Sequence, residues 1–172
     1  MFDYSNPDNV WSFVQAALVT LGFIFVVRQI FIAREQNSIS HLIHFRTTWN
    51  AEPLLSARQK ICEDYPKTDN ILTPHDDLVA AFLEDLAAAI QVSHANSKHA
   101  WSYFSYYIEI YYAMLGPTIE NYQSEIEATY FAGFKNLHRD FLGMSSGVQT
   151  VGKIKRLIEE ERRAVEFRIV HS

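Results

Sequence analysis

The stretch VWSFVQAALVTLGFIFVVRQIFIAREQ, residues 10–36, decides the fold of this chain. Its first eighteen residues carry no charge, and the aliphatic and Phe side chains are interrupted only by Trp11, Ser12, Gln15, Thr20 and Gly22. As a helix, these residues cover about 27 Å, close to the ~30 Å hydrocarbon core of a bilayer. Arg28 can reach the interface with its long side chain, so the apolar segment continues to residue 32. The pattern predicts a transmembrane helix over residues 10–32.

Two alternatives to a membrane span fit this stretch less well. A buried helix of a soluble bundle keeps a polar stripe at helical spacing, whereas residues 23–27 are apolar on every side. A cleaved signal peptide begins with basic residues, whereas the leader MFDYSNPDN, residues 1–9, is acidic. The apolar run also exceeds a usual signal core, and no A-x-A-like cleavage site follows it.

The flanking charges predict the topology. Asp3 and Asp8 precede the span without any Lys or Arg, whereas Arg28, Arg34 and Arg46 follow its uncharged residues 10–27. The positive-inside rule therefore places the short N-terminus, residues 1–9, outside the cell and the C-terminal domain in the cytoplasm. We expect a single-pass protein of the cell inner membrane.

The length and the charge of the chain limit its domain count and its possible partners. The 172 residues suffice for one domain with an appendage. The net charge is -5, with -7 over residues 35–142 and +2 over residues 153–168. Because nucleic acid is bound mainly by neutralising its phosphates, this acidic body argues against a nucleic-acid partner. The single cysteine, Cys62, cannot form an internal disulfide, which agrees with a reducing compartment.

Beyond the span, helical spacing predicts an all-α domain, a bundle of about four helices over residues 33–142. The first helix is expected to continue from the membrane, with its apolar side at Ile39, Leu42, Ile43, Phe45 or Arg46, and Trp49. Asn50 is a candidate N-cap, with Pro53 in the first turn, for a second helix that ends near Asp64. Residues 65–74 are predicted to form a loop.

Two further helices have clear sequence signals. The first begins at Pro74, with Thr73 as its candidate N-cap. Asp76 and Asp77 in its first turn interact favourably with the positive end of the helix dipole. Its expected buried face consists of Leu78, Phe82, Leu86, Ala89 and Ile90. In the second, HAWSYFSYYIEIYYAMLGP, residues 99–117, an aromatic-rich helix is predicted to end at Gly116 and Pro117.

A last core helix is expected from residue 118 or 124 to residue 141. The side chains expected to face inward are Ile126, Tyr130, Phe134, Leu137 and Phe141. Residues 143–152 are predicted to be a flexible linker. Residues 153–172 are predicted to form a charged helix with ion-pair spacing, such as Lys155 to Glu159. We expect this helix to be solvated, although a partner helix or lipid head groups could cover its apolar stripe of Ile154, Leu157, Ile158 and Val165.

Residues 75–90, HDDLVAAFLEDLAAAI, the aromatic helix and residues 111–122, YYAMLGPTIENY, carry a resemblance. Together they resemble a family of short, single-span, membrane-anchored bacterial proteins of unknown function with a cytoplasmic helical domain. The resemblance covers residues 10–142 and leaves the tail from Lys153 outside. It implies an anchored helical bundle. The family has no established catalytic residues, so the resemblance implies none here.

The histidines and arginines offer two weak candidate sites. His41 and His44 stand three residues apart and could supply two metal ligands, but no Cys pair or ExxH spacing adds the others. REQNSISH, residues 34–41, matches the loose Arg-x(4–6)-His pattern of some helical ribonucleases through Arg34 and His41. With nine Arg and seven His in the chain, about one such match is expected by chance. We predict no metal, cofactor or catalytic site.

Two clusters have a structural and a functional interpretation. The aromatic side chains of residues 100–115 surround Glu109 and could line a pocket for an apolar or cationic ligand. A wide core helix is the simpler interpretation, and a second span would be short and polar. The acids Asp76, Asp77, Glu84 and Asp85 could bind a metal, although solvated surface charge is the usual explanation.

Three functions remain. The first is a non-enzymatic interaction or assembly module that faces the cytoplasm, with the lipid bilayer and either a second copy or another protein as partners. The second is an oligomeric pore or membrane-perturbing effector of the defence type, in which Gln15, Thr20 and Gly22 face a lumen or a helix–helix seam. The third is a membrane-tethered helical ribonuclease. We favour the first because a claim of enzymatic function needs evidence at a site.

Overall fold

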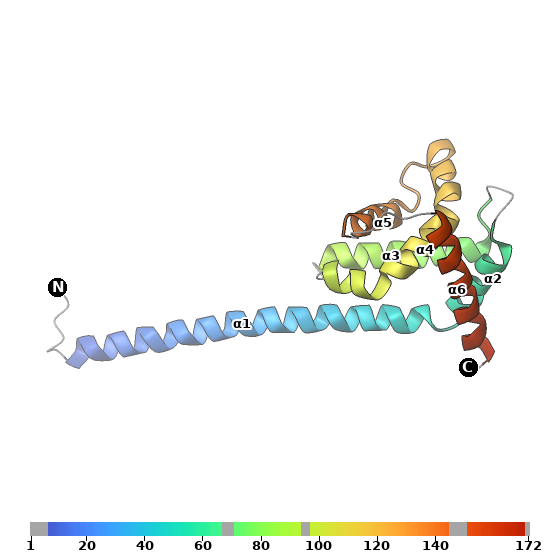
Figure 1. Ribbon diagram of the computed structural model, residues 1–172. Helices are drawn as coiled ribbons and strands as arrows, with labels where there is room; N and C mark the ends of the chain where they lie inside the picture. The colour runs from blue at the N-terminus through green and yellow to red at the C-terminus, as the bar shows by residue number, and fades with distance from the viewer. Residues whose placement is uncertain (1–6, 67–70, 94–96, 145–150, 171–172) are drawn as a thin grey trace. The chain divides into compact units, whose positions relative to one another are not determined.

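The computed structural model describes residues 7–66, 71–93, 97–144 and 151–170. These residues form six α-helices and no strand, which confirms the all-α prediction (Figure 1). The chain divides into two compact units, Met1–Ser38 and Ile39–Ser172. The first helix, α1, contributes residues to both.

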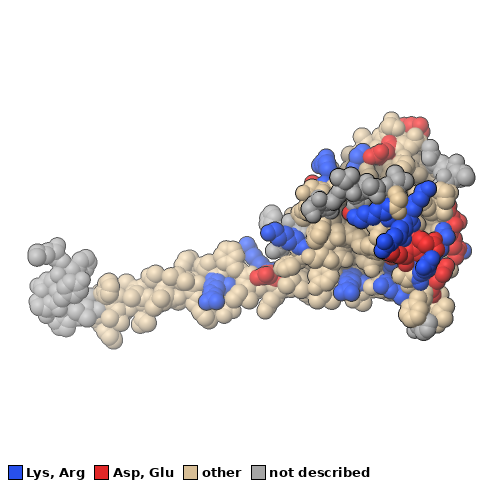
Figure 2. All heavy atoms as spheres, in the orientation of Figure 1, with Lys and Arg blue, Asp and Glu red and all other residues tan. Residues whose placement is uncertain are grey.

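Helix α1, Pro7–Trp49, contains the apolar stretch. It is the one helix among the described residues that is long and apolar enough to cross a membrane. Its large side chains, including Phe13, Leu21, Phe25 and Phe31, are exposed. We call the second unit, Ile39–Ser172, the body. In Figure 2 most of α1 is uncharged, whereas most Lys, Arg, Asp and Glu side chains lie on the body.

Helix α1 ends at Trp49 because other groups bind its last carbonyls. The hydroxyls of Thr47 and Thr48 donate to the carbonyls of Ile43 and His44, at 3.0 and 3.1 Å. The Asn50 side-chain amide donates to the carbonyl of Arg46 at 2.9 Å. The Asn50 bond satisfies one of the last four carbonyls, which every helix C-terminus leaves open, and the backbone amides of Asn50 and Ala51 bind the carbonyls of Thr47 and Thr48 at 3.1 Å. The prediction that Asn50 caps the next helix is therefore wrong, since its side chain closes the preceding one.

Helix α2, Leu54–Asp64, ends near the predicted residue. Pro53 is its N-cap and forms no side-chain capping bond. Ser56 supplies local bonds instead, donating to the Glu52 carboxylate at 2.7 Å and to the Pro53 carbonyl at 3.0 Å.

Helix α3, Pro74–Ser93, begins as the sequence predicts. The Asp76 amide donates to Thr73 Oγ1 at 3.3 Å, and the Thr73 amide donates to the Asp76 carboxylate at 2.6 Å, which is a capping box. The predicted buried face is shifted by one residue at its start. Val79 and Leu83 are fully buried, whereas Leu78 is exposed. Phe82 and Leu86 are buried as expected.

Helix α4, Ser97–Glu125, continues through the position where the sequence predicts its end. Gly116 and Pro117 lie inside it, and neither begins a turn. Gly116 serves packing, since an added Cβ would lie 2.9 Å from Cε1 of Tyr112. The helix continues because Thr118 and Ile119 are buried in the bundle. Tertiary packing thus outweighs the hydrogen bond that a proline removes.

Helix α5, Ala132–Met144, and helix α6, Val151–Val170, complete the chain. In α5, Phe134, Leu137 and Phe141 are buried as predicted. Ile126 lies before α5 and is 72% exposed, so its predicted core position is wrong. The predicted linker, residues 143–152, is shorter than expected, because α5 reaches Met144 and α6 begins at Val151. Residues 145–150 of that linker lie outside the described residues.

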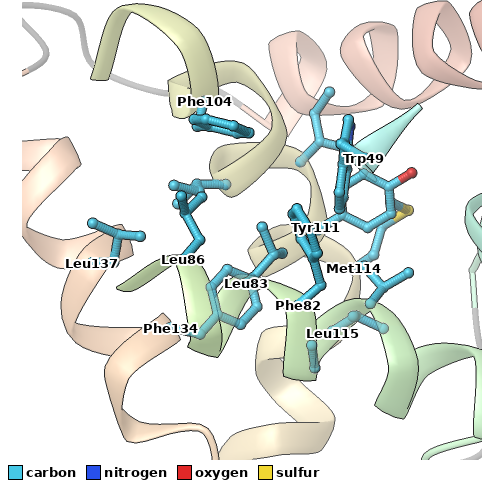
Figure 3. Close-up of a cluster of buried hydrophobic side chains, with 14 of the residues drawn as sticks. Trp49, Phe82, Leu83, Leu86, Phe104, Tyr111, Met114, Leu115, Phe134 and Leu137 are labelled. Atoms are coloured by element: carbon cyan, nitrogen blue, oxygen red, sulfur yellow. The ribbon is translucent and has the colours of Figure 1, made fainter. Parts of the chain in front are cut away.

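All six helices contribute to the core of the second unit, and Figure 3 shows part of it, with labelled side chains from α1, α3, α4 and α5. Trp49 contributes from the end of α1 and contacts the ring of Phe82 on α3, with centroids 5.2 Å apart. Ile43, also expected in the apolar face of α1, is 52% exposed. Helix α6 packs on α2 and α4 and buries Ile158 and Val165. The expectation of a solvated tail helix is therefore wrong.

Candidate functional site

A buried arginine organises the end of α1. Arg58 of α2 is fully buried, and its Nη1 donates to the carbonyl of Trp49 at 2.8 Å. Its guanidinium carbon lies 4.4 Å from the centre of the Trp49 ring and 5.4 Å from that of Tyr107. A desolvated cation over an aromatic face is stabilised by the ring quadrupole. One side chain therefore holds both the backbone end and the last side chain of α1.

Glu161 of α6 neutralises this arginine. Arg58 forms an ion pair with the Glu161 carboxylate through Nη2, and its Nε lies 3.2 Å from the same oxygen. The Tyr111 hydroxyl of α4 accepts a hydrogen bond from Arg58 Nε at 3.2 Å and donates to Glu161 at 3.1 Å. A buried ion pair persists when such additional hydrogen bonds satisfy its remaining atoms. Three helices thus share one polar cluster, Arg58, Tyr111 and Glu161, which we call the arginine cluster.

Two further arginines attach α6 to the same region. Arg162 donates from Nε to the Cys62 carbonyl of α2 at 3.1 Å. Arg168 donates to the side-chain oxygen of Asn50, the residue that closes α1. Helix α6 therefore binds beside the C-terminal ends of both α1 and α2, where the helix dipole places partial negative charge.

Burial changes the ionisation of the groups in and beside the arginine cluster. Burial alone disfavours the charged guanidinium, but contacts with Tyr111 and Glu161 outweigh it and raise the pKa of Arg58. Burial, with the Glu161 charge, raises the pKa of Tyr111 well above its usual value. Burial raises the pKa of the Cys62 thiol to about 11, so the thiol stays protonated at neutral pH. The reactive form of cysteine is the thiolate, and Cys62 is therefore inert.

The aromatic helix contributes to the core around Trp49. The rings of Tyr107 and Tyr111 each lie 5.2 Å from that of Trp49, at tilted or edge-to-face angles. Phe104 is also fully buried. Glu109 is half-buried on the same helix. The side chains of α4 thus support the core-helix interpretation of residues 100–115.

A second polar cluster links α4 and α5 nearer the surface. The Tyr112 hydroxyl donates to the Glu120 carboxylate at 2.8 Å, and Lys135 Nζ lies 3.3 Å from the same oxygen. The ring of His138 stacks on Tyr112 with centroids 4.0 Å apart. Burial lowers the pKa of His138, and the Glu120 charge offsets only part of this effect. This environment therefore favours the neutral form of His138.

The four acids of α3 occupy different environments. Asp76 is buried in the capping box, whereas Asp77 is exposed and accepts a hydrogen bond from the Tyr130 hydroxyl at 2.6 Å. Glu84 accepts bonds from the backbone amides of Gly133 and Phe134, at 2.9 and 2.6 Å. It thereby caps the start of α5, and the interpretation of Glu84 as solvated surface charge is wrong.

The other candidates from the sequence lie on α1. His41 and His44 are both exposed, as is Arg34. Among the described residues, no three His, Cys, Asp or Glu side chains gather closely enough to hold a metal ion. The Thr20 hydroxyl donates to the Ala16 carbonyl at 2.8 Å, so its hydrogen bond is made within the helix.

Sequence reasoning missed the arginine cluster, although a signal for it was present. Arg58 stands among Leu54, Leu55, Ile61 and Cys62, all buried, so a charge occupies the apolar side of α2. Glu161 likewise falls at helical spacing within the apolar stripe of α6. One opposite charge in each of two apolar stripes predicts a buried pair, because either charge alone would be costly to bury.

The arginine cluster can fix helices together, and it offers little chemistry. The guanidinium is permanently charged, the phenol and thiol are protonated, and Arg58, Tyr111 and Cys62 are all buried. Comparison with protein-family models, curated proteins and solved structures found no match to this chain.

Proposed function

We propose that this protein is a membrane-anchored, non-enzymatic interaction or assembly module whose helical body faces the cytoplasm. The observation that carries the proposal is the contrast between the two parts of α1. Its N-terminal part exposes large apolar side chains, whereas its last residue, Trp49, is fully buried in the body. A helix that exposes so many large apolar side chains needs an apolar environment, and the hydrocarbon core of a bilayer matches the length of this segment.

The polar groups of the body support a structural role. The strongest buried charge, Arg58, is neutralised by Glu161 and bonded to the end of α1. Glu84 caps a helix, and Asp76 completes a capping box. Arg58 thus ties the end of α1 to α2 and α6, and the two acids stabilise the starts of α5 and α3. The arrangement of an anchor followed by a bundle is also what the resemblance to single-span bacterial proteins implies.

The orientation follows from the flanking charges. Arg28 lies near the C-terminal end of the proposed span and Arg34 follows the span, and both are exposed. With the basic residues on the cytoplasmic side, the net charge of -7 over residues 35–142 lies in the cytoplasm. The body would then present an acidic surface to a protein partner or to other copies.

Extraction and protease protection of the full-length chain test this proposal. We expect the chain to stay in bacterial membranes after alkaline carbonate washing, with a C-terminal tag that protease reaches only after the cells are opened. Leu21→Arg places a charge at the centre of the span and should release the chain, whereas the matched variant Leu21→Ile should not. A wild-type chain that carbonate releases, or a tag cleaved in intact cells, would contradict the proposal.

The alternative function is an oligomeric pore, which experiments on the full-length chain can distinguish from an interaction module. Gln15 and Thr20 lie about 140° apart around an ideal helix, so both cannot face one narrow lumen. We expect full-length protein in nanodiscs to have the mass of a small oligomer and to leave vesicles impermeable to ions. A closed ring of four or more copies with measurable conductance would favour the pore.

A further inference from the structure

The glutamines of α1 lie in a strict register. Helix α1 contains three glutamines, Gln15, Gln29 and Gln36, and one glycine, Gly22. Successive members of the series 15, 22, 29 and 36 are seven residues apart. Seven residues make about two helical turns, so the four positions form one line along the helix. We call this line the glutamine line.

The side chains on the glutamine line are exposed. Gln15 and Gln29 fall within the proposed span, residues 10–32, and Gln36 follows it. A glutamine amide in hydrocarbon lacks water, and each donor and acceptor then needs a protein partner. Thr20 meets this need inside its own helix by donating to the Ala16 carbonyl. A glutamine side chain is better placed to meet it across a helix–helix contact.

Gly22 provides a second, independent observation. Glycine weakens the interior of a helix, so it is retained where its small size is useful. A Cβ added at Gly22 would meet no atom within 4 Å, so packing within this chain does not require glycine there. In membranes, glycine lets the backbones of two helices approach closely. Gly22 also lies midway between Gln15 and Gln29, where two helices that cross at a small angle would be closest.

The residues beside the glutamine line fit the same contact. Val19, Val26 and Ala33 are seven residues apart and follow the line at a spacing of four residues. Alternating spacings of three and four residues form the seam of a left-handed helix pair. The opposite side of α1 instead carries the bulky Ile24 and Phe31, which are exposed.

We propose that α1 pairs in parallel with α1 of a second copy of this chain through the glutamine line. This inference rests on the proposed membrane span. All copies enter the membrane in one orientation, so each glutamine meets its own counterpart at the same depth. An amide both donates and accepts hydrogen bonds and is therefore complementary to itself. A two-fold axis along the pair repeats this contact at both glutamine depths.

Cysteine cross-linking of the full-length chain in membranes tests the pairing. The variants Val19→Cys, Gly22→Cys and Val26→Cys place a thiol on or beside the line, and Ile24→Cys places one on the opposite side. The wild-type chain is the background control, because its Cys62 is fully buried. We expect oxidation to give disulfide-linked dimers in the first three variants and little in Ile24→Cys or wild type. The two valine variants keep the test informative if Gly22→Cys fails to insert.

A second measurement tests the amides themselves. Förster resonance energy transfer between donor- and acceptor-labelled full-length chains is measured in vesicles at increasing lipid-to-protein ratios. The decrease in transfer gives the dissociation constant of the dimer. We expect the double variant Gln15→Leu with Gln29→Leu to raise this constant about tenfold, since interhelical hydrogen bonds contribute modestly. The matched control Ile24→Leu with Phe31→Leu, on the opposite side of α1, should leave the constant unchanged.

The outcomes separate the pairing from the anchor. If carbonate leaves the chain in the membrane, three results would overturn the pairing. They are equal cross-linking of the Ile24 and Gly22 variants, a ring of more than two copies, and a monomer at every lipid dilution. A chain that carbonate releases would instead overturn the membrane span, and the pairing with it.

Discussion

Arg58 and Glu161 are 103 residues apart in the chain, yet they form an ion pair in which their side chains are 1% and 2% exposed. The pair joins α2 to α6, and Arg58 also bonds to the end of α1. Figure 1 shows α6 beside α2. The last helix of the chain thus helps to hold the first.

Removing one partner of this pair should destabilise the body strongly. Glu161→Ala leaves a buried guanidinium without its counter-charge, and we expect a loss of about 3–5 kcal/mol in the free energy of unfolding. Chemical denaturation of the full-length protein in detergent, followed by tryptophan fluorescence, measures it.

The double variant Arg58→Met with Glu161→Leu is the control for this prediction. It removes both charges and should recover most of the lost stability, apart from about 1 kcal/mol for the bond to the Trp49 carbonyl. A loss in the double variant equal to the sum of the losses in Arg58→Met and Glu161→Leu alone would show that the two charges do not interact.

The reactivity of the Cys62 thiol should report local unfolding around the arginine cluster. Cys62 is 0% exposed, and Arg162 of α6 binds its carbonyl. We expect an aromatic disulfide reagent at pH 8 to label native protein only as fast as the region opens, and denatured protein at once. Glu161→Ala should speed the labelling, whereas the exposed variant Glu166→Ala should not. Rapid labelling of native wild-type protein would contradict the buried thiol.

His138 should make the body less stable in mild acid. Burial lowers its pKa below the usual 6.5, so the unfolded chain binds a proton more readily than the folded one. Its contribution to stability is therefore present above about pH 6.5 and is lost as the pH falls below that value, by at most about 1.4 kcal/mol per pH unit.

Denaturation midpoints at pH 7.5 and 5.5 test the role of His138. His138→Gln should reduce the difference between the two, and the exposed control His41→Gln should leave it as in the wild type. Equal pH dependence in all three proteins would exclude His138 as its source. The carboxylate of Glu120, whose pKa the Tyr112 hydrogen bond lowers, titrates in a more acidic range.

Glu84 and Gly133 should depend on each other. A Cβ at Gly133 would lie 2.7 Å from the Glu84 carboxylate, which caps α5. We expect Gly133→Ala to displace the cap and Glu84→Ala to remove it, each lowering the free energy of unfolding by about 1–2 kcal/mol. Because both changes disrupt one contact, the double variant should lose little more than either single one. Fully additive losses, measured by denaturation, would contradict this.

The chain's own sequence predicted features that depend on nearby residues. The prediction that Thr73 caps α3 is confirmed, because its partner Asp76 lies within one helical turn. The core positions of Phe134, Leu137 and Phe141 are confirmed because helical spacing places them on one side of α5. The end of α4 was predicted wrongly, since Gly116 and Pro117 usually stop a helix and only packing reverses that preference.

The sequence alone determined the helical fold class, the long apolar segment of α1 and the start of α3, because composition, periodicity and capping express these locally. The last core helix begins at residue 132 and not at the predicted residue 118 or 124, because α4 continues to Glu125. Only the tertiary structure decided that Asn50 closes α1, that α6 belongs to the body, and that Arg58 meets Glu161. Each of these depends on a partner brought from elsewhere in the chain. A buried charge or an open carbonyl creates a need for a partner, and the folded arrangement of the helices determines which residue meets it.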